Sequence, residues 1–351
     1  MKIIHCIWSF NTGGAETMLI DIANEQAKTQ EVYVLIVNDS YQQFLIDRFS
    51  PEVKVILNKR KPNSRSLWPL IRLNRTLLRL RPDVIHIHNA ELPKVIIPLV
   101  SHGLFLTVHD LQIPLESVRH GMKLIAISEA VKEDVLRRGS YDITTIPNGI
   151  DVDAVKKRER HGLEGKMRIV QVAGLNAEKK GQDILIDAIA LLKNRGMDCI
   201  EVDFIGEGIS GEVLKALAQE KGIATQVHFL GLRDRDYIYS HLKDYDMMCH
   251  PSRYEGFGLT VAEGIAAMLP VLVSDEGGPY EIIERGRYGT SFKMESVEDC
   301  ADKIEYIYAN YLEVLNLTED AYEHTQKHYS IKRMVESYLE LYAKALKRKI
   351  I

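Results

Sequence analysis

Residues 247–263 read MMCHPSRYEGFGLTVAE, the pattern of a short apolar strand, a glycine-containing loop and a helix that begins near Gly258. Glu255 lies in the loop, and Glu263 lies about one turn inside the helix. The unpaired backbone N–H groups and the positive dipole end at the start of such a helix favour a diphosphate. A carboxylate on either side accepts hydrogen bonds from hydroxyl groups. The segment therefore predicts a site for a ligand that carries sugar, diphosphate and ribose in that order.

The same alternation of strand and helix extends over the whole chain from this segment. Short β-branched runs are separated by amphipathic helical stretches, which is typical of parallel sheets with crossover helices. A charged stretch after residue 149 marks a break between two doubly wound domains. We predict domains over 1–160 and 161–330, with a C-terminal helix over 331–351 that packs back on the first. The predicted strands are 2–8, 32–37, 53–57, 84–88, 104–108, 123–127 and 143–146, then 168–173, 202–206, 227–230, 247–250 and 271–274.

The composition is that of an ordinary globular protein. Of the 351 residues, 46% are apolar and 27% are charged; no apolar run is long enough to cross a membrane, and the first residues show no signal-peptide cleavage pattern. We expect a cytoplasmic protein without disulfides, because its four cysteines are far apart in the sequence. Residues 1–160 carry 22 basic and 18 acidic side chains, and the remainder carries 23 and 31. The basic excess of the first part indicates an anionic partner, which we do not expect to be a nucleic acid.

Two more glycine turns follow predicted strands. Gly13 and Gly14 precede a helical pattern, and such a turn lets backbone N–H groups approach an anion. Residues 206–211 match G-x-G-x-x-G, and Asp234 lies some 23 residues beyond, as in a nicotinamide-binding unit. A nicotinamide-dependent oxidoreductase is therefore an alternative. Against it, this turn follows the second strand of its domain and not the first.

Together, the motifs of the chain resemble those of family 4 glycosyltransferases, retaining enzymes of the GT-B fold. The resemblance covers nearly the whole chain. It implies two Rossmann-like doubly wound domains that face each other across a cleft. The motifs that carry it, in order, are GGAE at 13–16, TVHD at 107–110, ISEAVKEDVL at 127–136, IPNGID at 146–151, EKKGQDIL at 178–185, FIGEG at 204–208, FLG at 229–231, PSRYEGFGLTVAE at 251–263 and EGGPYEII at 276–283.

The resemblance also implies roles for individual residues. Lys180 would bond the donor phosphates, Glu255 the transferred sugar and Glu263 the ribose, while His109 would lie near the sugar and the acceptor. The other donor-binding residues would be Gly13, Gly14, Gly206, Leu232, Arg233, Gly256, Phe257, Gly258, Leu259 and Thr260. Leu175 departs from the family pattern, in which an arginine commonly stands five residues before the lysine. Lys180 with the helix N-terminus, Lys179 or Arg253 would then have to supply the missing phosphate contact.

The expected function is transfer of a hexose-type sugar from a UDP- or GDP-sugar to a glycan or lipid-linked acceptor in surface polysaccharide or glycolipid synthesis. We expect no metal cofactor: His86 and His88 are interpreted as structural, and three D-x-D triplets are expected by chance among 49 acidic residues. A GT-B epimerase, a phosphorylase and a catalytically silent nucleotide-sugar sensor remain alternatives.

The segment 59–81 holds eight basic residues and no acidic one. The pattern predicts a helix with one broad apolar face made by Leu67, Leu70, Ile71, Leu77 and Leu78. Trp68 is expected among the basic residues on the other face, which are Arg65, Arg72, Arg75 and Arg79. An exposed basic face with a tryptophan favours an anionic membrane surface, at the inner face of the plasma membrane, over an ordinary solvated helix. Pro69 leaves open a shorter helix in which Trp68 belongs to the cap.

Overall fold

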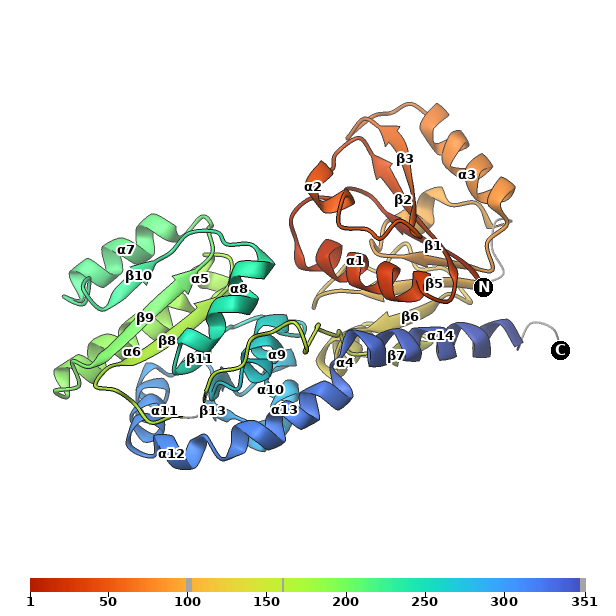
Figure 1. Ribbon diagram of the computed structural model, residues 1–351. Helices are drawn as coiled ribbons and strands as arrows, with labels where there is room; N and C mark the ends of the chain where they lie inside the picture. The colour runs from red at the N-terminus through yellow and green to blue at the C-terminus, as the bar shows by residue number, and fades with distance from the viewer. Residues whose placement is uncertain (99–102, 160, 348–351) are drawn as a thin grey trace. The chain divides into compact units, whose positions relative to one another are not determined.

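The computed structural model describes residues 1–98, 103–159 and 161–347 and is drawn in Figure 1. The chain separates into two compact units, one formed by Met1–Gly149 with Ile331–Ile351 and the other by Ile150–Ser330. The division thus falls at Gly149. The boundary expected from the sequence, residue 160, and the last four residues of the expected C-terminal helix lie outside the described residues.

The first unit is built on a parallel sheet of seven strands in the order β3-β2-β1-β4-β5-β6-β7. Its central strands are apolar along most of their length and fully buried, as expected for a sheet with helices on both faces. The strands are β1 (Lys2–Ile7), β2 (Glu31–Asn38), β3 (Lys54–Arg60), β4 (Val84–Ile87), β5 (Gly103–Val108), β6 (Lys123–Ala126) and β7 (Ile143–Thr145).

Helices connect these strands, and the last helix of the chain joins them. The C-terminal helix packs against the first helix and against β5, within the first unit (Figure 1). Its buried Tyr338 and Tyr342 reach the interior of this unit. The helices are α1 (Gly14–Ala27), α2 (Gln43–Ile46), α3 (Trp68–Leu80), α4 (Glu129–Arg137) and α14 (Ile331–Lys347), with a 3-10 turn at Leu92–Val95.

The second unit contains a parallel sheet of six strands in the order β10-β9-β8-β11-β12-β13. The sequence analysis missed β13, which has only three residues, two of them polar, and pairs at the edge of the sheet. The strands are β8 (Met167–Val172), β9 (Ile200–Ile205), β10 (Val227–Phe229), β11 (Met247–His250), β12 (Val271–Ser274) and β13 (Thr290–Phe292). The two doubly wound parallel sheets predicted from the sequence are confirmed.

The helices of the second unit begin at residues that can cap them. The side chain of Asn176 accepts the Lys179 N–H at the start of α5, and Asp234 accepts the Tyr237 N–H at the start of α8. Asp234 belongs to one of the D-x-D triplets, so this carboxylate has a structural role. The helices are α5 (Ala177–Lys180), α6 (Gln182–Asn194), α7 (Gly211–Glu220), α8 (Arg235–His241), α9 (Leu259–Ala266), α10 (Gly277–Ile282), α11 (Val297–Ala309), α12 (Tyr311–Val314) and α13 (Leu317–His328), with 3-10 turns at Leu242–Asp244 and Glu284–Gly286.

Each sheet has one point at which the order of its strands reverses. This switch point lies between β1 and β4 in the first unit and between β8 and β11 in the second. The connections after the two strands at such a point leave in opposite directions, and ligands of open α/β sheets bind in the crevice that results. A ligand site is therefore expected at the loops that follow these four strands.

Candidate active site

Two loops of the second unit meet at its switch point. Lys180 ends α5, in the connection after β8, and Glu255 lies in the loop after β11. Their side chains form an ion pair in the structure. The residues expected to bind the phosphates and the sugar of a donor are therefore in direct contact, although they are far apart in the sequence.

The carboxylate of Glu255 has a second basic neighbour, which the sequence analysis did not single out. His250 ends β11, and its Nε2 lies 3.4 Å from Oε2 of Glu255. Burial alone would raise the pKa of Glu255, but the hydrogen bond with His250 and the charge of Lys180 outweigh it and hold the pKa well below its usual range. Glu255 is therefore ionised at neutral pH and suited to accept hydrogen bonds from sugar hydroxyls.

The helix that follows this loop begins as the sequence predicts. Gly258 precedes α9 with a φ of 96°, a conformation that favours glycine, and a Cβ there would lie 2.9 Å from Cγ of Pro279. Glu263 lies in the second turn of α9 and is 9% exposed. The remaining predicted residues lie in the buried end of the loop, Gly256 and Phe257, or in the first turn of the helix, Leu259 and Thr260.

The G-x-G-x-x-G segment follows β9 in the same unit and packs against the loop after β8. A Cβ on Gly206 would lie 2.1 Å from the carbonyl oxygen of Ala173, and a Cβ on Gly208 would lie 2.4 Å from that of Leu175. The close approach of the two loops is therefore enough to explain these glycines, and no bound nicotinamide is needed to account for them. Leu232, beyond β10, is 60% exposed, and Arg233 places its guanidinium 5.0 Å from the ring centroid of Tyr237.

The position of the missing arginine, Leu175, and one of its proposed substitutes, Arg253, are engaged elsewhere. Leu175, where family members commonly have arginine, is 5% exposed and packs into the hydrophobic core of the second unit. The guanidinium of Arg253 makes two hydrogen bonds of 2.8 Å to Asp183, one of 2.8 Å to Glu295 and one of 2.7 Å to the Ala177 carbonyl. A phosphate would have to break this network to bind Arg253, so Lys180 with the start of a helix, or Lys179, is the better candidate.

The predicted glycine turn of the first unit lies at the start of α1. Gly13 precedes the helix in an extended conformation, and a Cβ there would lie 2.5 Å from Oε2 of Glu16. A Cβ on Gly14 would meet no atom of the described residues within 4 Å. The backbone at Gly14 is thus open to a ligand in the first unit taken by itself.

His109 follows β5 in the first unit and touches a cluster of buried histidines. Its Nε2 lies 3.1 Å from Nδ1 of His88, whose Nε2 lies 3.0 Å from Nδ1 of His5. His86 stacks on His88 and pairs with the hydroxyl groups of Thr107 and Tyr342. The sequence analysis interpreted His86 and His88 as structural and passed over His5. The sequence did contain a signal for the cluster, because histidine alternates with buried aliphatic residues in β1 and β4. Such alternation places these rings on one face of the sheet.

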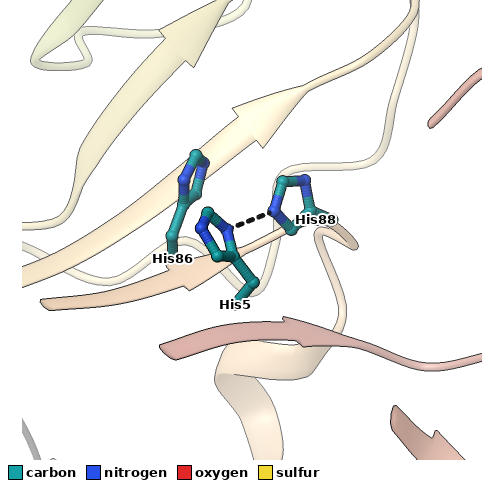
Figure 2. Close-up of side chains that lie close together, drawn as sticks. All are labelled: His5, His86 and His88. Carbon is teal, nitrogen blue, oxygen red and sulfur yellow. Dashed lines mark hydrogen bonds between the residues drawn. The ribbon is translucent and has the colours of Figure 1, made fainter. Parts of the chain in front are cut away.

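Figure 2 shows the rings of His5, His86 and His88, which come from two neighbouring strands. One nitrogen from each ring lies within 4.8 Å of the others, a spacing that also occurs around metal ions. All six ring nitrogens already have hydrogen-bond partners, however. Each ring of the cluster is therefore fully hydrogen-bonded without a metal ion.

We expect acid to destabilise the first unit because of this cluster. Burial lowers the pKa of His5 from 6.5 to about 4. Between these two pH values the unfolded chain binds a proton that the folded chain does not, so the free energy of unfolding falls as the pH decreases from 6.5 towards 4. For one ring this amounts to about 3 kcal/mol. Hydrogen exchange of the β1 and β4 amides at pH 7.5 and 5.0 measures it, and equal protection after correction for intrinsic rates would contradict the prediction.

The basic helix lies where the sequence predicts, but its buried face is different. α3 buries Leu73, Asn74 and Leu77, whereas Leu67, Ile71 and Leu78 of the predicted apolar face are 68%, 46% and 44% exposed. The predicted apolar face is therefore buried only in part: Leu77 is buried and Leu70 is half-buried, whereas its other members are exposed beside basic side chains. The exposed set also comprises Trp68, which is 77% exposed, with Arg65, Arg72, Arg75 and Arg79 as predicted.

Arg72 is exposed, as predicted for the basic set, and it also has partners within the unit. Its guanidinium donates to the backbone carbonyl and, at 3.2 Å, to the side-chain oxygen of Asn58. Arg72 therefore links α3 to β3 while its side chain remains exposed. None of the helices in the described ranges has the length and apolar character that a membrane span requires.

Comparison with known proteins connects this architecture to one family. The sequence profile described as "Glycosyl transferases group 1" matches residues 153–328, and that described as "Glycosyltransferase Family 4" matches residues 12–154. Alpha-D-kanosaminyltransferase of Streptomyces kanamyceticus is 30% identical over 42% of this chain and 38% of its own length. A GDP-mannose-dependent alpha-(1-6)-phosphatidylinositol monomannoside mannosyltransferase of Mycobacterium tuberculosis is 28% identical over 45% of each chain. These alignments span less than half the length of either relative.

The solved structures support the fold over the whole chain. The crystal structure of HepE from Anabaena, in complex with UDP and glucose, superposes with a TM-score of 0.81 over 98% of this chain and 99% of HepE, at 21% identity. This likeness confirms the GT-B fold class that the sequence predicts. Two profiles that together cover residues 12–328, and a fold shared along the full length, show that the chain belongs to the group 1 glycosyl transferases, in family 4.

Proposed function

We propose that the chain transfers a hexose-type sugar from a UDP- or GDP-sugar to a hydroxyl group of a glycan or lipid-linked acceptor. The observation that carries the proposal is the contact between Lys180 and Glu255 beside the start of α9. A cation, an ionised carboxylate and the N-terminus of a helix at one switch point match a donor's diphosphate and sugar. HepE, solved with UDP and glucose, and the GDP-mannose-dependent relative support a nucleotide-sugar donor of either base.

In the proposed reaction, the bond between the anomeric carbon and the phosphate oxygen breaks, and both of its electrons stay with the diphosphate. The acceptor oxygen bonds to the anomeric carbon on the same face and gives its proton to the departing phosphate. Lys180 and the backbone N–H groups at the start of α9 stabilise the charge that develops on the diphosphate. Glu255 holds the sugar and Glu263 holds the ribose through their hydroxyl groups.

The proposal includes retention of anomeric configuration and independence from metal ions. No nucleophile is assigned, because Glu255 is paired with Lys180 and His250. An epimerase or a phosphorylase of the same fold would give different products. An epimerase leaves no glycosylated acceptor, and a phosphorylase requires inorganic phosphate.

The proposed function is tested with a panel of UDP- and GDP-sugars in thermal-shift assays, followed by measurement of nucleoside diphosphate release with the stabilising donor. We expect one donor class to raise the melting temperature and to release its nucleoside diphosphate when acceptor is added, with and without EDTA. Stabilisation without release under any acceptor would identify a nucleotide-sugar sensor. No stabilisation by any nucleotide sugar would overturn the proposal.

We also propose that α3 docks the enzyme on an anionic membrane surface where a lipid-linked acceptor resides. The exposed side of the helix carries Trp68, Ile71, Arg75 and Leu78, which recur every three or four residues, and Arg79 beside them. Exposed apolar and basic side chains on one face suit the boundary between lipid headgroups and acyl chains. The mannosyltransferase relative, whose acceptor is a phosphatidylinositol mannoside, supports a lipid acceptor.

The charge reversal Arg75→Glu with Arg79→Glu is expected to abolish sedimentation with vesicles that contain anionic lipid. Each basic residue near such a surface contributes about 1 kcal/mol, so reversing two of them weakens binding by at least 10-fold. Arg48→Glu with Arg137→Glu makes the same change in net charge at exposed sites of the first unit outside α3 and serves as the control. Equal binding of both variants, or no binding by the native chain at low salt, would contradict membrane docking through α3.

A further inference from the structure

A continuous row of hydrogen-bonded groups crosses the interior of the first unit and ends at His109. It starts at Gln26 in α1, whose Oε1 lies 2.8 Å from Nε2 of His5. His5 Nδ1 lies 3.0 Å from His88 Nε2, as the dashed line in Figure 2 marks, and His88 Nδ1 lies 3.1 Å from His109 Nε2. Gln26, His5 and His88 are 0%, 0% and 3% exposed, so water does not compete for these bonds.

The rings in this row are neutral at physiological pH. Burial lowers the pKa of His5 and of His109 to about 4. It lowers the pKa of His88 well below 6.5, and the neighbouring histidines add to that effect. A neutral imidazole has one nitrogen that donates and one that accepts. Each ring in the row must therefore donate on one side and accept on the other.

The amide of Gln26 sets the direction of the row. Its carbonyl oxygen accepts only, so Nε2 of His5 carries the hydrogen and Nδ1 of His5 accepts. His88 then donates from Nε2 and accepts at Nδ1, and His109 donates from Nε2. The hydrogen-bond acceptor of His109 is consequently Nδ1.

We propose that Gln26, His5 and His88 are positioning residues that fix the ring of His109 as its Nε2–H tautomer, so that Nδ1 is the acceptor for a hydroxyl group of a sugar substrate that binds at the first unit. The identity of that ligand rests on the proposed function. The tautomer and orientation of His109 rest only on contacts within the first unit. His109 is the end of the row that is partly exposed, whereas the other three members are buried.

The packing of the cluster favours this role over a metal site. The rings of His86 and His88 stack with centroids 4.5 Å apart and an interplanar angle of 28°. Both nitrogens of His86 are used by the hydroxyl groups of Thr107 and Tyr342. Both nitrogens of His5 and of His88 are used along the row, so a metal ion would have to break the connection to His109 or to Gln26. An apolar core would be at least as stable as three satisfied imidazoles, so packing alone does not require them.

Tautomers are read directly by long-range ¹H–¹⁵N correlation spectra of the full chain labelled with ¹⁵N-histidine at pH 7.5. We expect His5, His88 and His109 to show the Nε2–H pattern in the ligand-free protein. Gln26→Met keeps the volume of the side chain and removes the acceptor. We expect it to give His109 a mixture of tautomers and to lower kcat by roughly 10-fold, the size of one lost hydrogen bond between uncharged groups.

Thr107→Val is the matched control. It removes the hydroxyl that hydrogen-bonds to His86, within the same buried cluster but outside the row. We expect it to keep the His109 tautomer and the kcat of the native chain while it lowers stability by a similar amount. Equal losses of kcat in the two variants would show a structural role and overturn the proposal.

Two further results would overturn it without reference to any variant. One is an Nδ1–H pattern for His109 in the native chain, and the other is a stoichiometric metal ion in the purified protein with His5 and His88 as ligands. The tautomers are measured without substrate. If the tautomers are as expected but no donor is turned over, the proposed function is wrong, whereas the positioning of His109 by the hydrogen-bonded row is supported.

Discussion

Lys180→Ala is expected to lower kcat by about 100-fold to 1000-fold, the usual effect of removing one group that stabilises developing charge in an active site. The ammonium group of Lys180 contacts Glu255 at the switch point of the second unit. When the bond to the anomeric carbon breaks, the diphosphate gains about one negative charge. A cation beside it therefore stabilises the transition state more than the bound donor, and kcat should fall more than KM rises. Nucleoside diphosphate release at saturating donor measures the effect.

Lys166→Ala provides the control for this variant. Lys166 also forms an ion pair with a glutamate of the second unit, Glu201, but its side chain is 65% exposed. Exposed pairs contribute little to stability, so this variant should keep native turnover and native stability. If Lys180→Ala retains native turnover with the identified donor, the residue has no part in the reaction.

The parallel sheets and the helix start after Glu255 were predicted from patterns that depend on neighbouring residues. Alternating apolar runs and helices predict parallel sheets because each connection must cross a face. The loop with Glu255 and the start of α9 lie within one short segment, whose glycines and apolar positions define where strand and helix stop. Local sequence therefore determined these features, and the structure agrees with the predicted start of the helix at Gly258.

The face of α3 was not predictable in the same way. The apolar arc of this helix is wider than the face that packs inward, so an amphipathic projection does not show which part of the arc is buried. One contact that orients the helix joins Arg72 to Asn58 in β3, 14 residues earlier in the chain. Arg72 remains exposed while it makes this contact, and Ile71 and Leu78 are exposed beside it.

The row of histidines could not be predicted from the sequence, for a different reason. It depends on the register of β1 against β4, which pairs His5 with His86, and on α1, which brings Gln26 to the same rings. The residues that bond are up to 83 positions apart. A histidine in a buried strand indicates a hydrogen-bond partner, but the sequence does not say which one. Sheet register and helix packing supply that information only after folding.

Glu263→Gln is expected to weaken binding of the free nucleoside diphosphate by about 10-fold to 150-fold, whereas Glu255→Gln should leave it nearly unchanged. Glu263 is 9% exposed in α9, and a carboxylate there accepts two ribose hydroxyl hydrogens, which an amide cannot do equally well. Hydrogen bonds to a charged group contribute about 1.5 to 3 kcal/mol. Glu255 is placed at the sugar, so its loss should appear in turnover of the donor and not in nucleoside diphosphate affinity. Isothermal titration of both variants with UDP and GDP measures the difference. Equal affinities in the two variants would contradict the assignment of the ribose to Glu263, and a loss confined to Glu255→Gln would reverse the order of the ligand along the loop and helix.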